Sequence, residues 1–280
     1  MFLSVRDNRE VFSILTPRKN IEKFQVLGVN ISAVGLGEAC EFLDSLVAEK
    51  AKAYVCVAPV STVVSCQDDA KYRDIVNKAR MVTPDGMPLV WLGRRRGFKK
   101  MGRTYGPDLM LKVCGEGQAK GYKHYLYGAT EDCLEKLERE LKKRFPGIRI
   151  AGRFSPPFTE VSSERHAEIL AEINCREPDI LWVGLGSPKQ DFWMKENRDK
   201  LTAPVMVGVG AAFDFISGTK KQAPKWMQRS GLEWFFRLCC EPRRLWKRYL
   251  VGNSKFIFFL LRDWWRGASL KQKRESDVSG

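Results

Sequence analysis

Short apolar runs alternate with helix-forming segments along most of this sequence, and this alternation constrains the fold more than any other feature. Three runs, residues 53–60, 179–186 and 204–210, are apolar almost throughout, as expected of strands buried on both faces of a sheet. Strands are also expected at residues 24–31, 79–86, 123–128 and 147–152, and helices at residues 37–50, 61–79, 130–145 and 162–175. Alternating strands and helices predict an α/β fold, a parallel sheet with helices on both faces.

The character of the chain changes after residue 222. Strand-like runs stop there, and residues 220–274 carry fifteen Lys and Arg against three Asp and Glu, a net +12 of the formal +15 of the whole chain. Five of the eight Trp lie in the same segment. We therefore predict three parts: an extension over residues 1–22, an α/β domain over residues 23–222, and a basic, aromatic, helical appendage over residues 223–280.

The charge of this appendage favours an anionic partner. A helix that begins at Pro242 would place Arg244 and Arg248 on one face, and residues 256–265 are strongly apolar, a combination typical of an element lying on an anionic membrane surface. Two alternatives stay open: a pair of helices packed on the domain, and a nucleic-acid-binding tail with aromatic residues for stacking. Salt-dependent binding to anionic liposomes, but not to oligonucleotides, would favour the membrane.

Other features narrow the location and the chemistry. The longest uncharged run, residues 53–67, is too short to span a bilayer, and charged residues interrupt residues 1–20, where a signal peptide needs an apolar core. We therefore expect a cytoplasmic protein that binds the inner face of the cell membrane as a peripheral protein. The eight Cys form no CxxC pair and only two His are present, so neither a metal site nor a cofactor is predicted.

The residues that follow the strands form the candidate site, because ligands of open parallel sheets bind beyond the carboxyl ends of the strands. Asp85 comes directly after a strand, in the turn TPDG, where a carboxylate can act as a general base toward a hydroxyl group. The alternative is that Asp85 only shapes the turn or caps a helix. The basic run 94–103 follows closely and is either a solvated surface or a phosphate contact.

Two glycine-rich turns follow later strands. GLGSPKQD (184–191) suits a phosphate through its backbone N–H groups, and Lys189 and Gln190 add polar side chains to the same crevice. GVGAAFD (208–214) ends at Asp214, which either contacts a sugar or nucleotide or caps the following turn. Residues 27–35 lack the dinucleotide fingerprint after the first strand, which weighs against an NAD-dependent oxidoreductase or a nucleotide-sugar epimerase.

Several motifs occur together and in order: VTPDGMPLVW (82–91), YGPDL (105–109), GLGSPKQDFWM (184–194), VGVGAAFDF (207–215), APKWMQRSGLEWFFRL (223–238) and EPRRLWKRYL (241–250). With them the chain resembles the WecG/TagA/CpsF family of bacterial glycosyltransferases from about Val26 to Leu250. The resemblance implies a Rossmann-like α/β fold of the GT-E type, with a C-terminal appendage that helps to form the active site at the membrane. It also implies metal-independent, inverting transfer of a sugar from a UDP-sugar to a polyprenyl-diphosphate-linked saccharide.

The resemblance also implies roles for individual residues. Asp85 is the expected general base, and Gln190 is expected to lie in the active-site pocket with it. Arg237, Arg244 and Arg248 are expected to reach the acceptor diphosphate. Substrate contacts are expected from Thr83, Gly86, Arg103, Gly184, Gly186, Lys189, Gly210 and Asp214.

The chain departs from the family pattern at several positions. Pro59 stands where the family usually has Asn, and Asp191 stands where the PKQE motif has Glu. Gly102 replaces the Glu of a Glu–Arg pair, and Gln222 occupies a position where an RAP sequence is common.

The favoured function is transfer of a hexose or N-acetylhexosamine in the synthesis of an exopolysaccharide or cell-wall polymer. Its expected partners are a UDP-sugar donor, a polyprenyl-diphosphate-linked acceptor and an anionic membrane surface, with no nucleic acid. Self-association into a homo-oligomer is left open. The alternatives are a nucleotide-sugar-binding oxidoreductase or epimerase, and a nucleic-acid binder that uses its basic tail.

Overall fold

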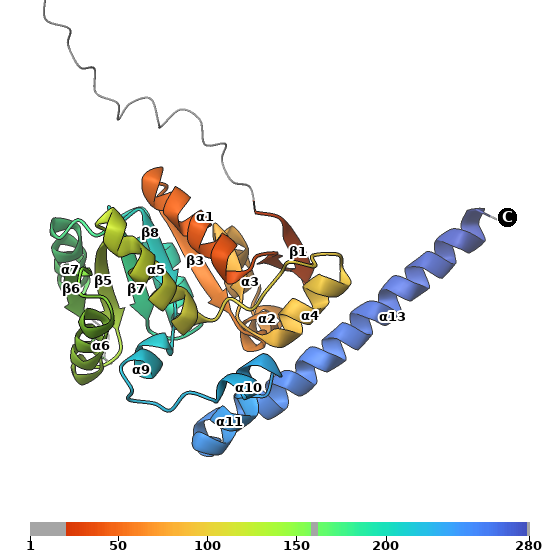
Figure 1. Ribbon diagram of the computed structural model, residues 1–280. Coiled ribbons are helices and arrows are strands. Elements are labelled where there is room, and N and C mark those ends of the chain that lie inside the picture. Colours follow the sequence, from red (N-terminus) through yellow and green to blue (C-terminus); the bar gives the residue numbers. More distant parts are fainter. Residues whose placement is uncertain (1–20, 158–161, 279–280) are drawn as a thin grey trace, which may run out of the picture.

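Figure 1 shows the computed structural model of the chain, which describes residues 21–157 and 162–278, with side chains as far as Trp265. The predicted extension over residues 1–22 lies outside the described residues except for its last two positions.

A six-stranded sheet forms the centre of the fold. Its strand order is β4-β3-β8-β7-β5-β6, and all neighbouring strands in it are parallel. The strands are β3 (Ala53–Ala58), β4 (Met81–Pro84), β5 (Lys123–Gly128), β6 (Arg149–Phe154), β7 (Ile180–Gly184) and β8 (Val205–Gly208). β3 and β8 are buried at every position, as their apolar sequences predict. The α/β fold is therefore confirmed, although β6 begins two residues later than expected.

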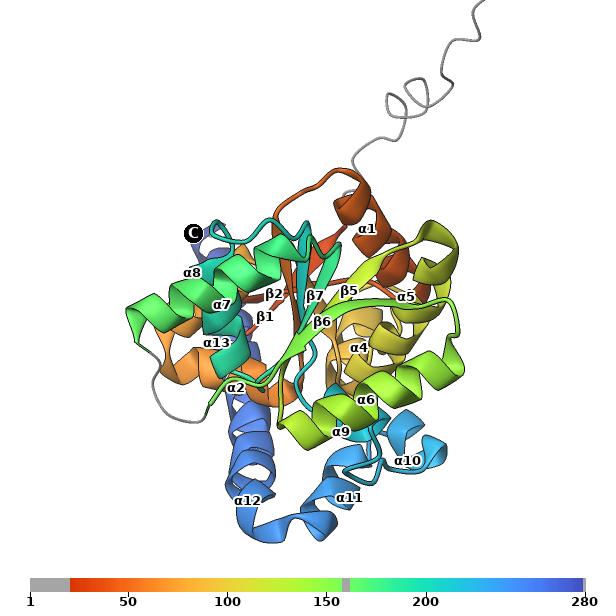
Figure 2. The same ribbon diagram turned by 90° about the vertical axis from the view of Figure 1, so that its left-hand side faces the viewer.

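Helices cover both faces of the sheet, so the fold has three layers and two hydrophobic cores (Figure 1, Figure 2). Successive residues of a strand point to opposite faces, so Val55 packs in one core and Cys56 in the other. The first core is closed by α1 (Leu36–Ala48), α5 (Gly106–Lys120) and α6 (Glu131–Arg144). The second is closed by α2 (Val60–Asp68), α3 (Ala70–Lys78), α7 (Ser163–Cys175) and α8 (Lys189–Asn197).

The segment 24–31, predicted as a single strand, is instead a β-hairpin. β1 (Lys23–Val26) and β2 (Val29–Ser32) pair antiparallel in a separate two-stranded sheet. Leu27 and Gly28 connect them with φ values of 50° and 76°, the backbone twist that suits a two-residue hairpin turn. Apolar residues alternate along both strands, so the run resembled one strand although the chain reverses in its middle.

The helix predicted over residues 61–79 is divided into two. α2 ends at Asp68, and Asp69 takes an extended conformation with φ of −134°. The Asp69 side chain accepts a hydrogen bond of 2.9 Å from the backbone N–H of Tyr72 and so caps the N-terminus of α3. The single-helix prediction was wrong because this aspartate begins a new helix.

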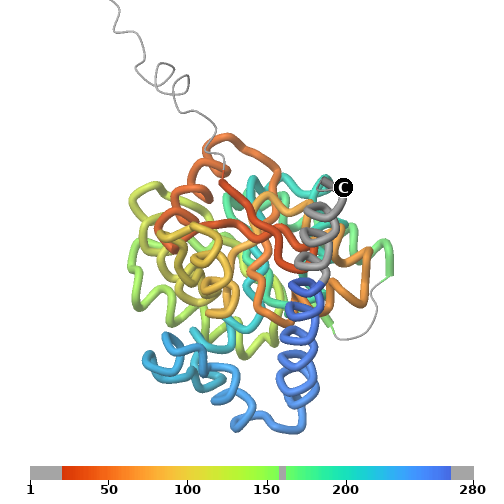
Figure 3. Tube along the Cα trace, turned by 90° about the vertical axis from the view of Figure 1, so that its right-hand side faces the viewer, coloured from red at the N-terminus to blue at the C-terminus, as the bar shows by residue number. Residues whose placement is uncertain are grey.

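Helices follow residue 222, as predicted. They are α10 (Lys225–Arg229), α11 (Glu233–Cys240), α12 (Pro242–Trp246), the π-helical segment η2 (Lys247–Val251) and α13 (Gly252–Val278). α13 packs on α2 (Figure 3) and then extends beyond the domain (Figure 1). Leu245, Tyr249 and Phe256 are buried, so part of the appendage packs on the domain. The boundary at residue 222 itself stays a prediction.

The appendage carries most of the large apolar side chains that are exposed on the described surface. Within the described residues, all exposed large hydrophobic side chains except Trp91 lie between residues 226 and 265. They are Trp226, Leu232, Phe235, Trp246, Leu250, Val251, Ile257, Phe258, Leu261, Trp264 and Trp265. None of the described helices has the length and apolar character needed to cross a membrane.

Candidate functional site

Two adjoining cavities lie where the strands end and the appendage meets the domain. A polar cavity of about 180 Å³ is lined by the turns after β7 and β8, and an apolar cavity of about 510 Å³ is lined mainly by α4 (Met87–Arg95), α11 and α13. Four residues line both cavities: Pro59, Asp85, Arg237 and Arg248. The predicted general base and two of the predicted acceptor arginines therefore stand at the junction.

Asp85 is held at this junction by the backbone of two neighbouring strands. Its backbone N–H donates to the carbonyl oxygen of Ala58, at the end of β3, at 3.1 Å. Gly86 then lies at the N-terminus of α4 and lines the apolar cavity. The Asp85 side chain keeps 20% of its surface exposed, so its carboxylate remains accessible to a substrate hydroxyl.

Arg103 joins Asp85 to the appendage. Its Nη2 lies 3.3 Å from Oδ1 of Asp85 and also donates to Oε2 of Glu233, the first residue of α11. Its guanidinium carbon lies 4.1 Å from the ring centre of Tyr105. Arg103 was predicted from the sequence, whereas Glu233 was not. Its only signal in the sequence is that it is one of three acids in a strongly basic segment.

These neighbours set the acidity of Asp85. Burial raises the pKa of Asp85 from its usual 3.8 to about 6, against the opposing effect of the Arg103 charge. The Glu233 carboxylate raises this pKa further, and Arg237 lowers it. A carboxyl with a pKa near 6 is ionised at neutral pH and is a stronger base than an ordinary aspartate.

Gln190 shapes one wall of the polar cavity. It is buried in the first turn of α8, and its Oε1 accepts a hydrogen bond of 3.2 Å from the backbone N–H of Gly186. Its Nε2 donates to Oγ of Ser187 at 3.2 Å. Gly186 and Gly210 have φ values of 78° and 54°, which glycine adopts without strain, and both line the cavity together with Gly184.

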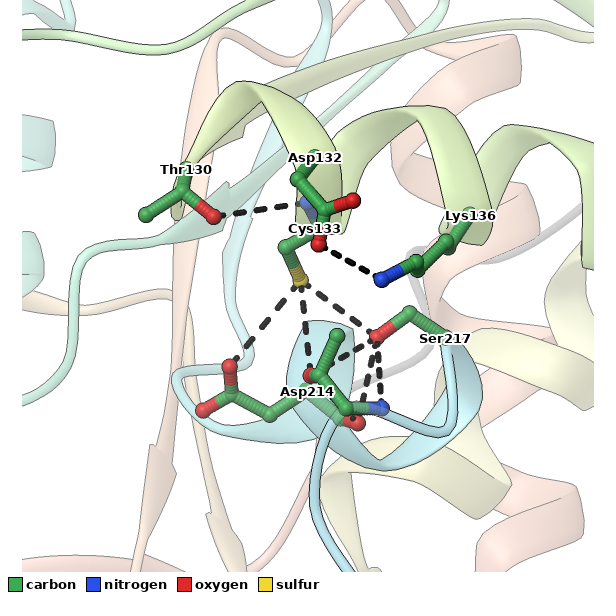
Figure 4. A network of polar contacts seen from close by, with 7 residues as sticks. Thr130, Asp132, Cys133, Lys136, Asp214 and Ser217 are labelled. Carbon is green, nitrogen blue, oxygen red and sulfur yellow. Dashed lines mark hydrogen bonds and ion pairs between the residues drawn. The ribbon is translucent and has the colours of Figure 1, made fainter.

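Asp214, in α9 (Ala212–Ile216), also lines the polar cavity. It forms an ion pair of 2.8 Å with Lys220, which also lines the polar cavity and was not predicted. Figure 4 shows how α6 supports this aspartate: Sγ of Cys133 lies 3.9 Å from Oδ1 of Asp214 and 3.4 Å from Oγ of Ser217. Asp214 is thus both a cavity residue and part of a packed polar network.

The three predicted arginines all reach the polar cavity from the appendage. Nε of Arg248 donates to Oγ of Ser61 at 3.0 Å, and Arg237 lies over the ring of Phe215 at 5.3 Å. Arg244 pairs with Glu241 at 2.6 Å. Burial lowers the pKa of Arg248, which reflects a positive charge that water solvates poorly.

Two predicted substrate contacts lie elsewhere. Thr83 is fully buried within β4, one residue before the turn, and lines none of the described cavities. Lys189 is exposed at the start of α8 and lines none of them either. In the described part of the chain, no group of three or more His, Cys, Asp or Glu could hold a metal ion.

Two residues that depart from the family pattern lie at or next to the cavities. Pro59 precedes α2 and contributes an apolar ring to both cavities. Asp191 is buried behind Gln190, and its Oδ2 accepts a hydrogen bond of 2.7 Å from the hydroxyl of Tyr72, while burial raises the pKa of this carboxyl. Asp191 therefore fixes the start of α8 from the core.

The chain is similar to proteins of known family. The model of the glycosyl transferase WecG/TagA/CpsF family matches residues 24–270. Proteins named N-acetylglucosaminyldiphosphoundecaprenol N-acetyl-beta-D-mannosaminyltransferase are similar to the chain. The one from Bacillus subtilis (strain 168) is 29% identical over 209 residues, which cover 75% of this chain and 79% of that protein. The one from Staphylococcus aureus (strain NCTC 8325 / PS 47) is 26% identical over 242 residues, which cover 86% and 91%. Because the family match spans most of the sequence, the chain belongs to the WecG/TagA/CpsF family of glycosyltransferases.

Proposed function

We propose that the protein is an inverting glycosyltransferase that moves a hexose or N-acetylhexosamine from a UDP-sugar to a polyprenyl-diphosphate-linked saccharide. The names of its relatives describe transfer of an N-acetylmannosaminyl group to a saccharide on diphosphoundecaprenol. The observation that carries the proposal is the position of Asp85 between a cation-lined polar cavity and an apolar cavity. The product would enter exopolysaccharide or cell-wall polymer synthesis.

The proposed reaction is a single displacement. The Asp85 carboxylate takes the proton of an acceptor hydroxyl, and the hydroxyl oxygen forms a bond to the anomeric carbon of the donor. The bond from that carbon to the diphosphate oxygen breaks, and UDP leaves with the electron pair. Attack from the side opposite the leaving group inverts the anomeric centre.

Charge on the leaving diphosphate would be stabilised by side chains of the polar cavity. Lys220, Arg237, Arg244 and Arg248 line it, and oriented cations of this kind stabilise a developing anion in a partly dry site. We propose that these groups make the reaction independent of a divalent metal ion.

Binding to the inner face of the cell membrane is part of the proposal. The exposed apolar side chains of the appendage lie among its Lys and Arg, so insertion and electrostatic attraction would act together. A lipid-linked acceptor would then reach the site from the bilayer surface.

Release of UDP tests this function. The full-length protein is incubated with a panel of UDP-sugars and polyprenyl-diphosphate-linked acceptors, with and without EDTA. We expect UDP release that needs both substrates and changes little with EDTA. Absence of acceptor-dependent release with every donor would overturn the function, and a loss with EDTA that Mg²⁺ restores would overturn metal independence.

Glu233→Gln is expected to shift the acidic limb of the pH profile of kcat/KM to lower pH. In the wild type this limb should lie near pH 6, with about a tenfold loss per pH unit below it. The Glu233 carboxylate raises the pKa of Asp85, so removal of its charge lowers this pKa. The charged groups that still face Asp85 are all cations: Arg103, Arg237 and Arg248.

The matched control is Glu241→Gln, which removes another appendage carboxylate that pairs with Arg244 instead. Profiles of both variants between pH 5 and pH 8 test the prediction. A limb that stays in place in Glu233→Gln, or that moves equally in both variants, contradicts the coupling through Arg103.

A further inference from the structure

The larger of the two adjoining cavities is not explained by a sugar, a nucleotide or a diphosphate, because its lining is largely hydrocarbon. We propose that this apolar cavity binds the first isoprene units of the acceptor lipid, which leave the bilayer and enter the protein during transfer. The proposal rests on the proposed function and adds a hydrocarbon subsite to it.

Most of the large apolar side chains in the lining come from three helices. α4 contributes Met87, Trp91 and Leu92, α11 contributes Trp234, and α13 contributes Phe256, Ile257 and Leu260. A volume of about 510 Å³ falls within the roughly 300–1,000 Å³ of typical small-molecule sites. Burying hydrocarbon in such a space is favourable, because it removes both the ligand and the lining from water. The cavity therefore fits a short stretch of an apolar chain.

Positive charge at the inner end of the cavity favours a ligand with an anionic head group. Arg103 is neutralised by Asp85 and Glu233, but Arg237 and Arg248 form no salt bridge within the described residues. These two cations line the junction with the polar cavity. A diphosphate joined to an apolar tail fits this arrangement, with the diphosphate at the two cations and the tail in the apolar cavity.

The outer end of the cavity opens toward an apolar surface. Trp91 and Ile257 line the cavity, yet they are 46% and 58% exposed, so they mark its mouth. Exposed Phe258, Leu261 and Trp264 continue along α13 beyond it. These side chains would give the rest of a long lipid chain apolar contacts on its way from the cavity to the membrane.

Binding of farnesyl diphosphate to the full-length protein, without membranes or detergent, tests the proposal. Trp91 and Trp234 line the cavity, so quenching of tryptophan fluorescence reports occupation. Inorganic diphosphate and farnesol are the comparison ligands. We expect farnesyl diphosphate to bind at least about tenfold more tightly than either, because only it fills both ends of the site.

Ile257→Glu places a charge at the mouth of the cavity. It should weaken farnesyl diphosphate about tenfold or more and leave inorganic diphosphate within about twofold. Phe258→Glu is the matched control, because Phe258 lies on the same helix with 60% exposure but does not line the cavity. This variant should bind both ligands like the wild type. Circular dichroism confirms that both variants are folded.

The outcomes separate this proposal from the proposed function. Equal affinity for farnesyl diphosphate and inorganic diphosphate, or equal weakening by the two substitutions, would overturn the hydrocarbon subsite even if sugar transfer is observed. Tail-selective binding that Ile257→Glu abolishes supports the subsite even if no UDP-sugar is a donor, in which case only the proposed function fails.

Discussion

Asp85→Asn is expected to lower the turnover number about 10²–10⁴-fold, because asparagine cannot accept the proton of the acceptor hydroxyl. The loss should appear in kcat more than in KM for the donor, since Asp85 is proposed to act on the acceptor hydroxyl in the chemical step and not to hold the donor. The measurement is initial-rate UDP release with saturating donor and acceptor. Wild-type turnover in this variant would contradict the role of Asp85.

The fold should survive this change. The pKa of Asp85 is raised on folding, from 3.8 to about 6, so the folded state favours the protonated carboxyl. The resulting stabilisation is complete below pH 3.8 and is lost as the pH rises through 6. At pH 7.5 the carboxylate is ionised, and burying its charge costs free energy of folding. Asparagine is uncharged and lacks this cost, so the melting temperature at pH 7.5 should not fall. Asp108→Asn, which removes a partly exposed aspartate paired with Lys225, is the control for loss of one nearby charge.

A chain that ends at Gln222 is expected to lose nearly all transfer activity and most of its binding to anionic liposomes. It lacks Arg237, Arg244 and Arg248, and it also lacks Glu233, the second partner of Arg103. Each basic residue near an anionic surface contributes about 1 kcal/mol. Residues 223–280 carry thirteen Lys and Arg against five Asp and Glu, so removal of this net charge of +8 should abolish binding at moderate salt.

Liposome flotation and circular dichroism on the truncated protein test this expectation together. The six-stranded sheet ends at β8, so its strands should remain, although the face of α2 that packs on α13 becomes exposed. Full-length protein with Trp264 and Trp265 changed to Ser is the control that keeps the arginines and removes only apolar contact. A folded truncation that still floats with liposomes and transfers sugar would contradict the proposed role of the appendage.

The order of strands and helices could be predicted because burial leaves a local pattern in the sequence. The runs at β3, β7 and β8 are apolar without interruption, since both sheet faces are covered. The predicted elements were wrong where one sequence pattern is compatible with two structures. An alternating run is compatible with one strand or with a hairpin, and Leu27 and Gly28 gave too weak a turn signal to decide between them.

Position at a strand end was enough to select part of the candidate site. Asp85, Gln190, Gly186 and Gly210 line or shape the cavities because the carboxyl ends of parallel strands meet at one edge of the sheet. The same reasoning included Lys189, whose place at the start of α8 leaves its side chain exposed.

The sequence by itself determined the α/β alternation, the aspartate after β4 and the basic, aromatic character of the appendage, because each depends on neighbouring residues. Only the tertiary structure joined Arg103 to Glu233, which are 130 positions apart, and placed Arg237 and Arg248 beside Asp85. Such contacts depend on how helices dock on the sheet, which short-range periodicity does not specify. The apolar cavity has the same origin, since it exists only where α4, α11 and α13 meet.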